Sequence, residues 1–232
     1  MDYSLTAVLG VGFLMGIRHA MEPDHVAAVS TFVSQQRSVL RSCLLGTFWG
    51  IGHTSALLIA SLAVITFKVT IPPQVEKAIE TVVALVLILL GGHVLLRSLS
   101  DVHLHQHEHS HDGDSHSHVH VHVGAQDAHG HIHLLRMGRW PLLVGVLHGL
   151  AGSAALMLLI VATIPSPVAA LFYVLVFGIG STGGMLALSG LIGLPFVATA
   201  GRSRMAHVAI QAVAGGVSMI IGVIALWSLR GT

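Results

Sequence analysis

The stretch GIRHAMEPDHVAAVS, residues 16–30, places ionisable side chains inside an apolar run that extends over residues 4–33. Such a run is long enough for a helix that crosses a bilayer, which needs about 20 residues. The ionisable residues within it are Arg18, His19, Glu22, Asp24 and His25. A charge at the centre of a membrane helix costs about 3 kcal/mol, so it usually faces a cavity and marks an ion pathway. The stretch therefore predicts a spanning helix that carries a polar site.

The composition of the whole chain indicates a membrane protein. Of its 232 residues, 53% are hydrophobic and 9% are charged, which disfavours a soluble domain. Further apolar stretches follow at residues 42–67, 78–98, 140–163, 167–192 and 207–229. We therefore predict an all-α polytopic membrane protein with six transmembrane helices. The first helix lacks the basic start of a signal peptide, so we expect it to be retained.

The basic residues predict the orientation, because positively charged short loops stay in the cytoplasm. One side of the six-span arrangement receives Arg37, Arg41, Arg97, Arg136, Arg139, Arg202 and Arg204, and the other receives Lys68, Lys77 and Arg230. Both termini should then lie outside, with residues 100–139 in the cytoplasm. The net charge is only +1 and no Lys/Arg run occurs, so the expected macromolecular surroundings are the lipid bilayer and not a nucleic acid.

An internal repeat is visible at an offset of about 130 residues. Residues 16–30 align with 145–159, so that Gly16 meets Gly145 and His19 meets His148. In the same order, residues 50–61 align with 178–189, and residues 78–91 with 209–222. We predict two three-helix units, residues 1–99 and 140–232, separated by the loop 100–139. Because each unit has an odd number of spans, the two must run in opposite directions, as in many secondary transporters.

Pro23 predicts a break within the first helix. On a regular helix His19, Glu22 and His25 share a face, Asp24 points about 100° from His25, and the two histidines are about 9 Å apart along the axis. Proline cannot donate the helical bond to the carbonyl of His19, so the helix should open here and allow the imidazoles to approach each other. The alternative is that these charges form a polar contact between helices or a solvated turn.

Two further histidines lie at membrane depth. His53 is near the middle of the second helix, and His148 is matched with His19 by the repeat. Each is a candidate ligand, although a hydrogen-bonded core histidine is the alternative for both. His93 is expected to be structural or gating, and His207 interfacial. The complete set of candidate metal ligands is His19, Glu22, Asp24, His25, His53 and His148, with Arg18 expected to neutralise Glu22.

The metal chemistry must rest on nitrogen and oxygen, because Cys43 is the only cysteine. Imidazole with carboxylate suits nickel, cobalt, copper(II) or zinc. Residues 101–133 contain twelve histidines, mostly in His-x-His steps, which is the composition of a metal-binding tract. Such a tract has too few apolar residues for a packed core, so we expect it to be disordered.

HAMEPDH (19–25), together with GIGHTS (50–55), resembles the nickel/cobalt transporter family, in particular its short urease-accessory-type members. The resemblance implies transport of Ni²⁺ or Co²⁺ across a prokaryotic plasma membrane, with His19, Asp24, His25 and His53 as selectivity residues. It also implies a link to urease or another nickel enzyme. The usual uptake form reads Asp-Ala-Asp-His where this chain has Glu-Pro-Asp-His. HAMEP is similar to the motif of the efflux branch, which often carries a histidine-rich loop.

The sequence therefore favours a secondary Ni²⁺ or Co²⁺ permease that works by alternating access. Uptake is favoured over efflux because the Asp24–His25 pair is of the uptake type. No Gly-x4-Gly-Lys-Ser/Thr motif for nucleotides and no His-Glu-x-x-His motif of a zinc hydrolase occurs, so we expect neither an ATPase nor an enzyme, and no resident cofactor. The alternative from another class is a metal-sensing or storage protein that acts through the histidine tract.

Overall fold

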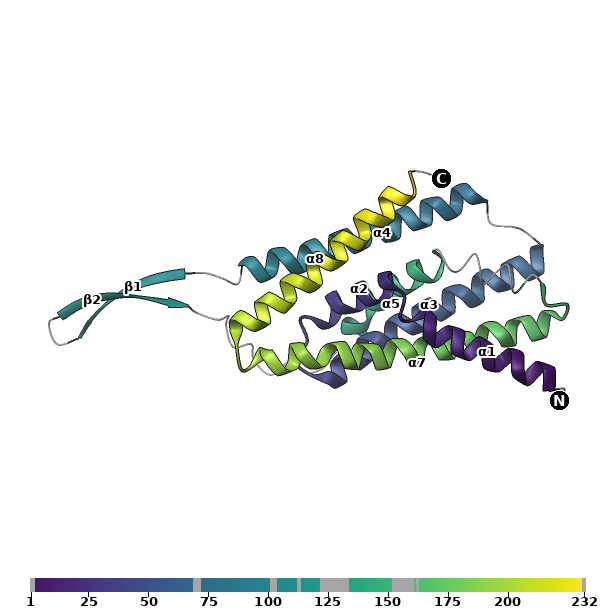
Figure 1. Cartoon of the computed structure of the whole chain (residues 1–232), viewed down its shortest axis with the longest axis horizontal. Coiled ribbons are helices and arrows are strands. Elements are labelled where there is room, and N and C mark those ends of the chain that lie inside the picture. The colour runs from purple at the N-terminus through teal and green to yellow at the C-terminus, as the bar shows by residue number, and fades with distance from the viewer. Residues whose placement is uncertain are drawn as a thin grey trace.

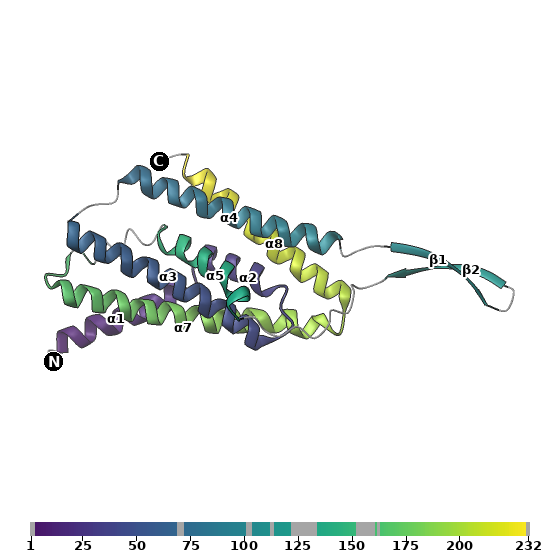
Figure 2. The same cartoon turned by 180° about the vertical axis from the view of Figure 1, so that it is seen from behind.

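The computed structural model describes residues 3–68, 72–100, 104–111, 114–121, 134–151, 161 and 163–230. These residues form an elongated helical bundle with a two-stranded hairpin projecting from one end (Figures 1 and 2). The elements are α1 (Tyr3–His19), α2 (Pro23–Val33), α3 (Val39–Phe67), α4 (Pro73–Ser100), β1 (Leu104–His111), β2 (Asp114–Val121), α5 (Leu134–Gly149), α7 (Pro167–Ala200) and α8 (Arg204–Ser228). Both chain termini lie at the end opposite the hairpin (Figure 1).

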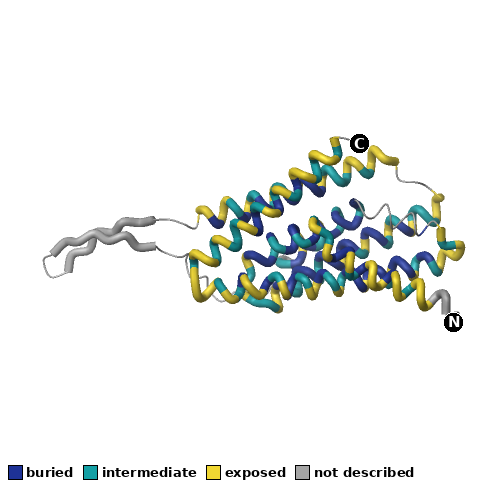
Figure 3. The backbone as a smooth tube through the Cα atoms, viewed as in Figure 1, coloured by how far each residue is buried: buried dark blue, intermediate teal, exposed yellow. Residues whose placement is uncertain are grey.

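Four of the helices, α3, α4, α7 and α8, are long and apolar enough to cross a membrane. Large apolar side chains are exposed on their outer faces, among them Ile59, Leu89 and Leu191, each at least 65% exposed. Figure 3 shows this exposed layer around a buried interior. Because lipid is as apolar as these side chains, a bilayer satisfies such a surface and water does not. The described chain is therefore a helical, multi-pass membrane protein.

The first apolar segment is broken, as Pro23 predicts. Glu22 has an extended backbone and Pro23 is at the start of α2. A proline is tolerated there because the first N–H groups of a helix have no intrahelical partner. The N–H of Glu22 donates to the carbonyl of His19 at 3.0 Å and closes the turn between α1 and α2. The single helix predicted over residues 4–33 is thus two helices, of 17 and 11 residues.

Six spans cannot be counted in the described residues. Of the predicted span 140–163, the structure describes residues 140–151, 161 and 163, and the remainder lies outside the described residues. The prediction of a helical protein with several membrane-spanning helices is confirmed. The number six stays a prediction, because one of the six segments is only partly described.

The helices pack in crossed pairs. Within the described chain, α3 lies against α7 and α4 lies against α8, while α1 packs on α7 and α5 packs on α3. Hydrogen bonds join these pairs: the hydroxyl of Thr54 donates to the carbonyl of Gly178 at 3.1 Å, and that of Ser218 donates to the carbonyl of Leu87 at 3.0 Å. Polar links of this kind hold helices together in lipid, where no hydrophobic force acts between them.

Glycines permit the closest helix contacts, and these contacts occur in matching pairs. Any Cβ at Gly16 would clash with the carbonyl of Phe177, and any Cβ at Gly145 would clash with the carbonyl of Trp49. Small residues allow backbones to approach in this way. Gly16 and Gly145 are the residues aligned by the internal repeat, and Trp49 and Phe177 each precede an aligned Gly-Ile-Gly.

The hairpin departs from the disorder expected across the histidine tract. β1 and β2 pair antiparallel, with Leu104 opposite Val121 and His111 opposite Asp114. The alternation of His with other residues has the period of two that strands show, and the helical period is absent from it. The prediction of disorder is therefore wrong for residues 104–111 and 114–121, and the rest of the tract lies outside the described residues.

Candidate metal centre

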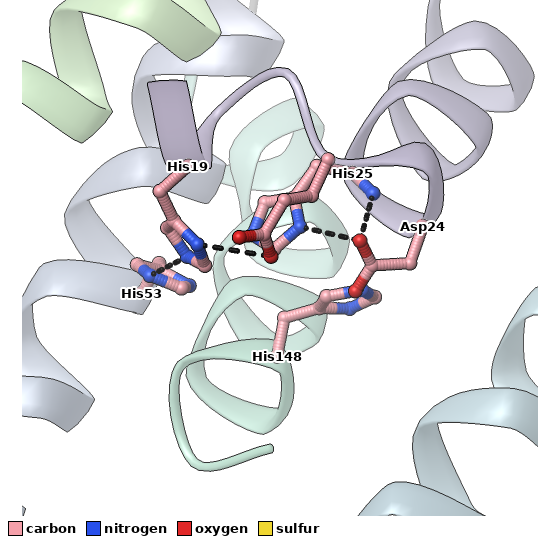
Figure 4. Close-up of polar contacts among 6 residues, drawn as sticks. His19, Asp24, His25, His53 and His148 are labelled. Carbon is pink, nitrogen blue, oxygen red and sulfur yellow. Dashed lines mark hydrogen bonds and ion pairs between the residues drawn. The ribbon is translucent and has the colours of Figure 1, made fainter. Parts of the chain in front are cut away.

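The break between α1 and α2 is the centre of the site. His19 is the last residue of α1, and Asp24 and His25 lie in the first turn of α2. His53 comes from the middle of α3, and His148 comes from the end of α5. Figure 4 shows these side chains converging on one region from four helices.

Three histidines form the inner part of the site. The Nε2 atoms of His19 and His53 share a hydrogen bond of 3.0 Å, and the rings of His19 and His25 are 4.4 Å apart between centroids. One ligand atom from each of His19, His25 and His53 lies within 4.8 Å of the others. Two nitrogens on opposite sides of one ion would be about 4 Å apart. A shift of less than about 1 Å would therefore close these three around a metal.

A second group shares His25 with the first. Ligand atoms of Asp24, His25 and His148 also lie within 4.8 Å of one another. Asp24 Oδ1 lies 3.0 Å from His25 Nδ1 and accepts the backbone N–H of His25 at 2.9 Å, and Asp24 Oδ2 lies 3.3 Å from His148 Nε2. His25 is therefore the residue through which the two groups are joined.

The imidazoles are buried and the carboxylates are partly open. His25 and His53 are each 1% exposed, whereas the side chains of Asp24 and Glu22 are 37% and 43% exposed. Nε2 of His25 and Nδ1 of His53 are buried and have no hydrogen-bond partner among the described residues. Buried polar atoms are rarely left unpaired. Ring nitrogens of this kind fit a metal ion that supplies the missing partner.

Glu22 pairs with His19 and not with Arg18. Its Oε2 lies 3.1 Å from Nδ1 of His19, so the partner expected from the sequence is replaced by a nearer one. Asp24 and His25 are consecutive residues of α2, and the Asp24 carboxylate still reaches His25 because its Oδ1 accepts the backbone N–H and lies beside the ring Nδ1. All six predicted ligands are thus near one another. Glu22 belongs to neither ligand group and contacts the site through Nδ1 of His19.

Two nearby residues were missed by the sequence reasoning. Trp49, on α3 one turn before His53, lies 5.1 Å from the ring of His25 and 5.5 Å from that of His148. Its spacing of four residues from His53 is a signal that would have found it. Glu80 of α4 lines a cavity of about 360 Å³ together with Asp24. No local pattern marks Glu80, because it shares the cavity with Asp24 only through the packing of α4 on α2.

The two histidines expected outside the site are outside it. His93 lies exposed on α4. His207, near the start of α8, shares a hydrogen bond of 3.0 Å with the hydroxyl of Thr199 and another of 3.1 Å with Gln211. Both are therefore available as control positions for the ligand histidines.

A helical membrane chain with buried imidazoles and carboxylates between its helices fits a class of proteins that carry a transition-metal ion across a membrane. A family model for high-affinity nickel-transport proteins (NicO) matches residues 5–229, and the chain belongs to this family. The resemblance seen in HAMEPDH is thereby confirmed. Membership also implies a transporter and not an enzyme.

Two relatives are similar over most of the chain. One is named urease accessory protein UreH, from Bacillus sp. (strain TB-90); it is 38% identical over 98% of this chain and 94% of its own length. The other is chloroplast protein FOR GROWTH AND FERTILITY 2 of Arabidopsis thaliana, which is 26% identical over 78% of this chain and 46% of its own length. No solved structure matches the chain.

Proposed function

We propose that the chain is a secondary transporter that takes Ni²⁺ or Co²⁺ across the prokaryotic plasma membrane by alternating access, in the uptake direction. The observation that carries this proposal is the convergence of His19, His25 and His53 at the break between α1 and α2, with Asp24 beside them. A broken helix within the membrane exposes backbone and side-chain ligands only where it lines an ion pathway.

The charges and ligand types suit a divalent transition metal. Asp24 and Glu22 supply two negative charges, which match the two positive charges of the ion, while neutral imidazoles supply the donor atoms. Glu22 beside Nδ1 of His19, and Asp24 beside Nδ1 of His25, would hold each ring with its Nε2 directed to the metal. In this proposal Glu22 orients His19 more than it binds the ion.

The different burial of the two ligand groups suggests the order in which the ion meets them. The group of Asp24, His25 and His148 includes the partly open carboxylate, and the group of His19, His25 and His53 is buried on every member. We propose that the ion enters at Asp24 and is handed by His25 to the buried group. The cavity that Asp24 shares with Glu80 is the proposed approach to the site.

Glu80→Gln is expected to raise the nickel concentration needed for half-maximal uptake by about 3- to 10-fold, with little change in maximal rate. Glu80 attracts the cation in a cavity that is not fully dry, where one charge pair contributes about 1 kcal/mol. Radioactive nickel uptake over a concentration series measures both quantities. The matched control is Glu76→Gln, which removes a carboxylate one turn earlier on α4 that does not line this cavity. An equal shift in both variants would remove Glu80 from the approach path.

The first helix of each proposed unit packs on the first long helix of the other unit, which supports two inverted repeats, residues 1–99 and 140–232, separated by residues 100–139. Helix α1 contacts α7 of the second unit as α5 contacts α3 of the first, and the glycine contacts Gly16–Phe177 and Gly145–Trp49 match under the repeat. Rocking of one unit against the other would then expose the midplane site to each side in turn.

The proposed topology has both termini outside and the hairpin in the cytoplasm. In a Cys43→Ser background, a cysteine introduced by Ser115→Cys is expected to resist a membrane-impermeant thiol reagent in intact cells and to react after permeabilisation. A cysteine introduced by Gln74→Cys, near the opposite end of the bundle, should react in intact cells. The basis is the positive-inside rule. Labelling of position 115 from outside would reverse the assignment.

The test of the function is nickel flux into proteoliposomes under imposed pH and voltage gradients. Inward accumulation supports uptake, and release from preloaded vesicles under the same gradients would favour efflux, the direction typical of HAMEP-type motifs.

Deletion of residues 103–133 should alter the transport capacity without removing flux. If all flux were lost while the protein still reached the membrane, the histidine tract would be the functional element. The relative named a urease accessory protein suggests that the nickel supplies urease or another nickel enzyme.

A further inference from the structure

The end of the bundle that bears the hairpin contains a strongly basic cavity of about 360 Å³. It lies between the loop that joins α2 to α3, the last turn of α4, and the turn that joins α7 to α8. Four arginines line it: Arg37, Arg97, Arg202 and Arg204. Among the described residues that line it, none is acidic.

The positive charge of Arg204, the least exposed of the four arginines, has no partner at its terminal nitrogens in the described part of the chain. Both terminal nitrogens of Arg204 are buried, and neither has a hydrogen-bond partner in the described part of the chain. A buried guanidinium without a partner is costly, because its hydration is lost and nothing replaces it. An anion within the cavity would supply the missing acceptors.

Hydrogen bonds to uncharged acceptors hold the walls of the cavity, so they do not neutralise the arginine charge. Arg97 Nη1 donates to Oε1 of Gln35 at 2.8 Å. Gln211 Nε2 donates to the carbonyl of Ser34 at 2.9 Å, which ties α8 to the end of α2. Arg97 is therefore held by an uncharged partner, and its positive charge stays available to a ligand.

The positive-inside rule explains why arginines are on this side of the membrane, but not why four of them converge. Arginines that serve topology alone can extend into water. We propose that this cavity binds a phosphate-bearing anion, either the headgroup of an anionic phospholipid or a soluble phosphate. Guanidinium groups bind phosphate through paired hydrogen bonds, and basic pockets between membrane helices bind lipid headgroups. The cavity has room for a phosphate with several waters, each of about 30 Å³.

The site joins the two halves of the chain. Gln35 and Arg37 follow α2, whose first turn holds Asp24 and His25. Arg202 lies in the turn between α7 and α8, and Arg204 is the first residue of α8. A bound anion would neutralise arginines from both sides and stabilise their contact. This inference stands on the cavity alone and does not depend on the transport proposal.

The test is the melting temperature of the purified full-length protein with two probes. The first is inorganic phosphate, compared with chloride at equal ionic strength. The second is phosphatidylglycerol added to detergent micelles, compared with phosphatidylcholine. We expect a rise of about 3 °C or more at saturation with at least one probe. A rise with phosphatidylglycerol alone identifies the headgroup as the ligand, and a rise with inorganic phosphate identifies the soluble anion.

Arg204→Gln should remove the shift, and Arg97→Gln, at a more exposed position, should remove at least half of it and serves if the first variant does not fold. The matched control is Arg139→Gln, an exposed arginine on α5 that does not line the cavity and should keep the full shift. The site is excluded if neither probe raises the melting temperature. It is also excluded if all three variants retain the shift, because the arginines would then act only as general surface charge.

Discussion

Asp24→Asn is expected to reduce nickel flux in proteoliposomes by about 100-fold or more while leaving the protein folded. The substitution keeps the shape of the side chain and leaves an oxygen that can accept the N–H groups of His25, which now donate to Oδ1. It removes the negative charge that offsets a divalent cation. Leaving a buried charge uncompensated costs about 3–5 kcal/mol, and each 1.4 kcal/mol is tenfold in affinity.

The measurement needs a control for charge alone. Glu76→Gln removes a carboxylate from the first turn of α4, away from the ligand groups, and should transport nickel at the normal rate. Size-exclusion elution and melting temperature of the metal-free Asp24→Asn protein should match those of the wild type. If Asp24→Asn carried nickel normally, the ion would pass elsewhere, and the charges around Pro23 would be a polar contact between helices.

His25→Ala is expected to abolish both transport and nickel binding, because His25 is the member that the two ligand groups share. Nickel should raise the melting temperature of the wild type, since a ligand at 100 times its dissociation constant stabilises a protein by about 2.7 kcal/mol. The same nickel concentration should leave His25→Ala unchanged. His148→Ala keeps the group of His19, His25 and His53 whole, so part of the shift should remain.

Two further variants separate ligand loss from damage to the fold. His25→Ala leaves a cavity beside Trp49, whose ring is 5.1 Å from that of His25. His25→Gln fills more of this space but lacks the imidazole, and it should lose nickel binding equally. His93→Ala removes an exposed histidine from α4 and should retain the full shift. A nickel-dependent shift of wild-type size in His25→Gln would show that the metal binds at other residues.

The sequence by itself determined the features that depend on local chemistry. The apolar stretches predicted a helical membrane protein because length and hydropathy act within one segment. Pro23 predicted the break because proline lacks the N–H that a helix interior needs. The six candidate ligands were identified because ionisable residues at membrane depth are costly and need a function. Two local predictions failed. Residues 104–111 and 114–121 of the histidine tract pair as strands, and Glu22 pairs with His19 where Arg18 was expected.

The tertiary structure alone decided which of these residues meet. Asp24 meets His148, and Trp49 and Glu80 enter the surroundings of the site. These contacts join residues far apart in the chain, and they exist because glycines such as Gly16 and Gly145 let particular helices approach backbone to backbone. A one-dimensional pattern specifies which face of a helix is polar, but the partner of that face depends on which neighbouring helix has a complementary surface. Helix packing therefore determined the geometry of the site.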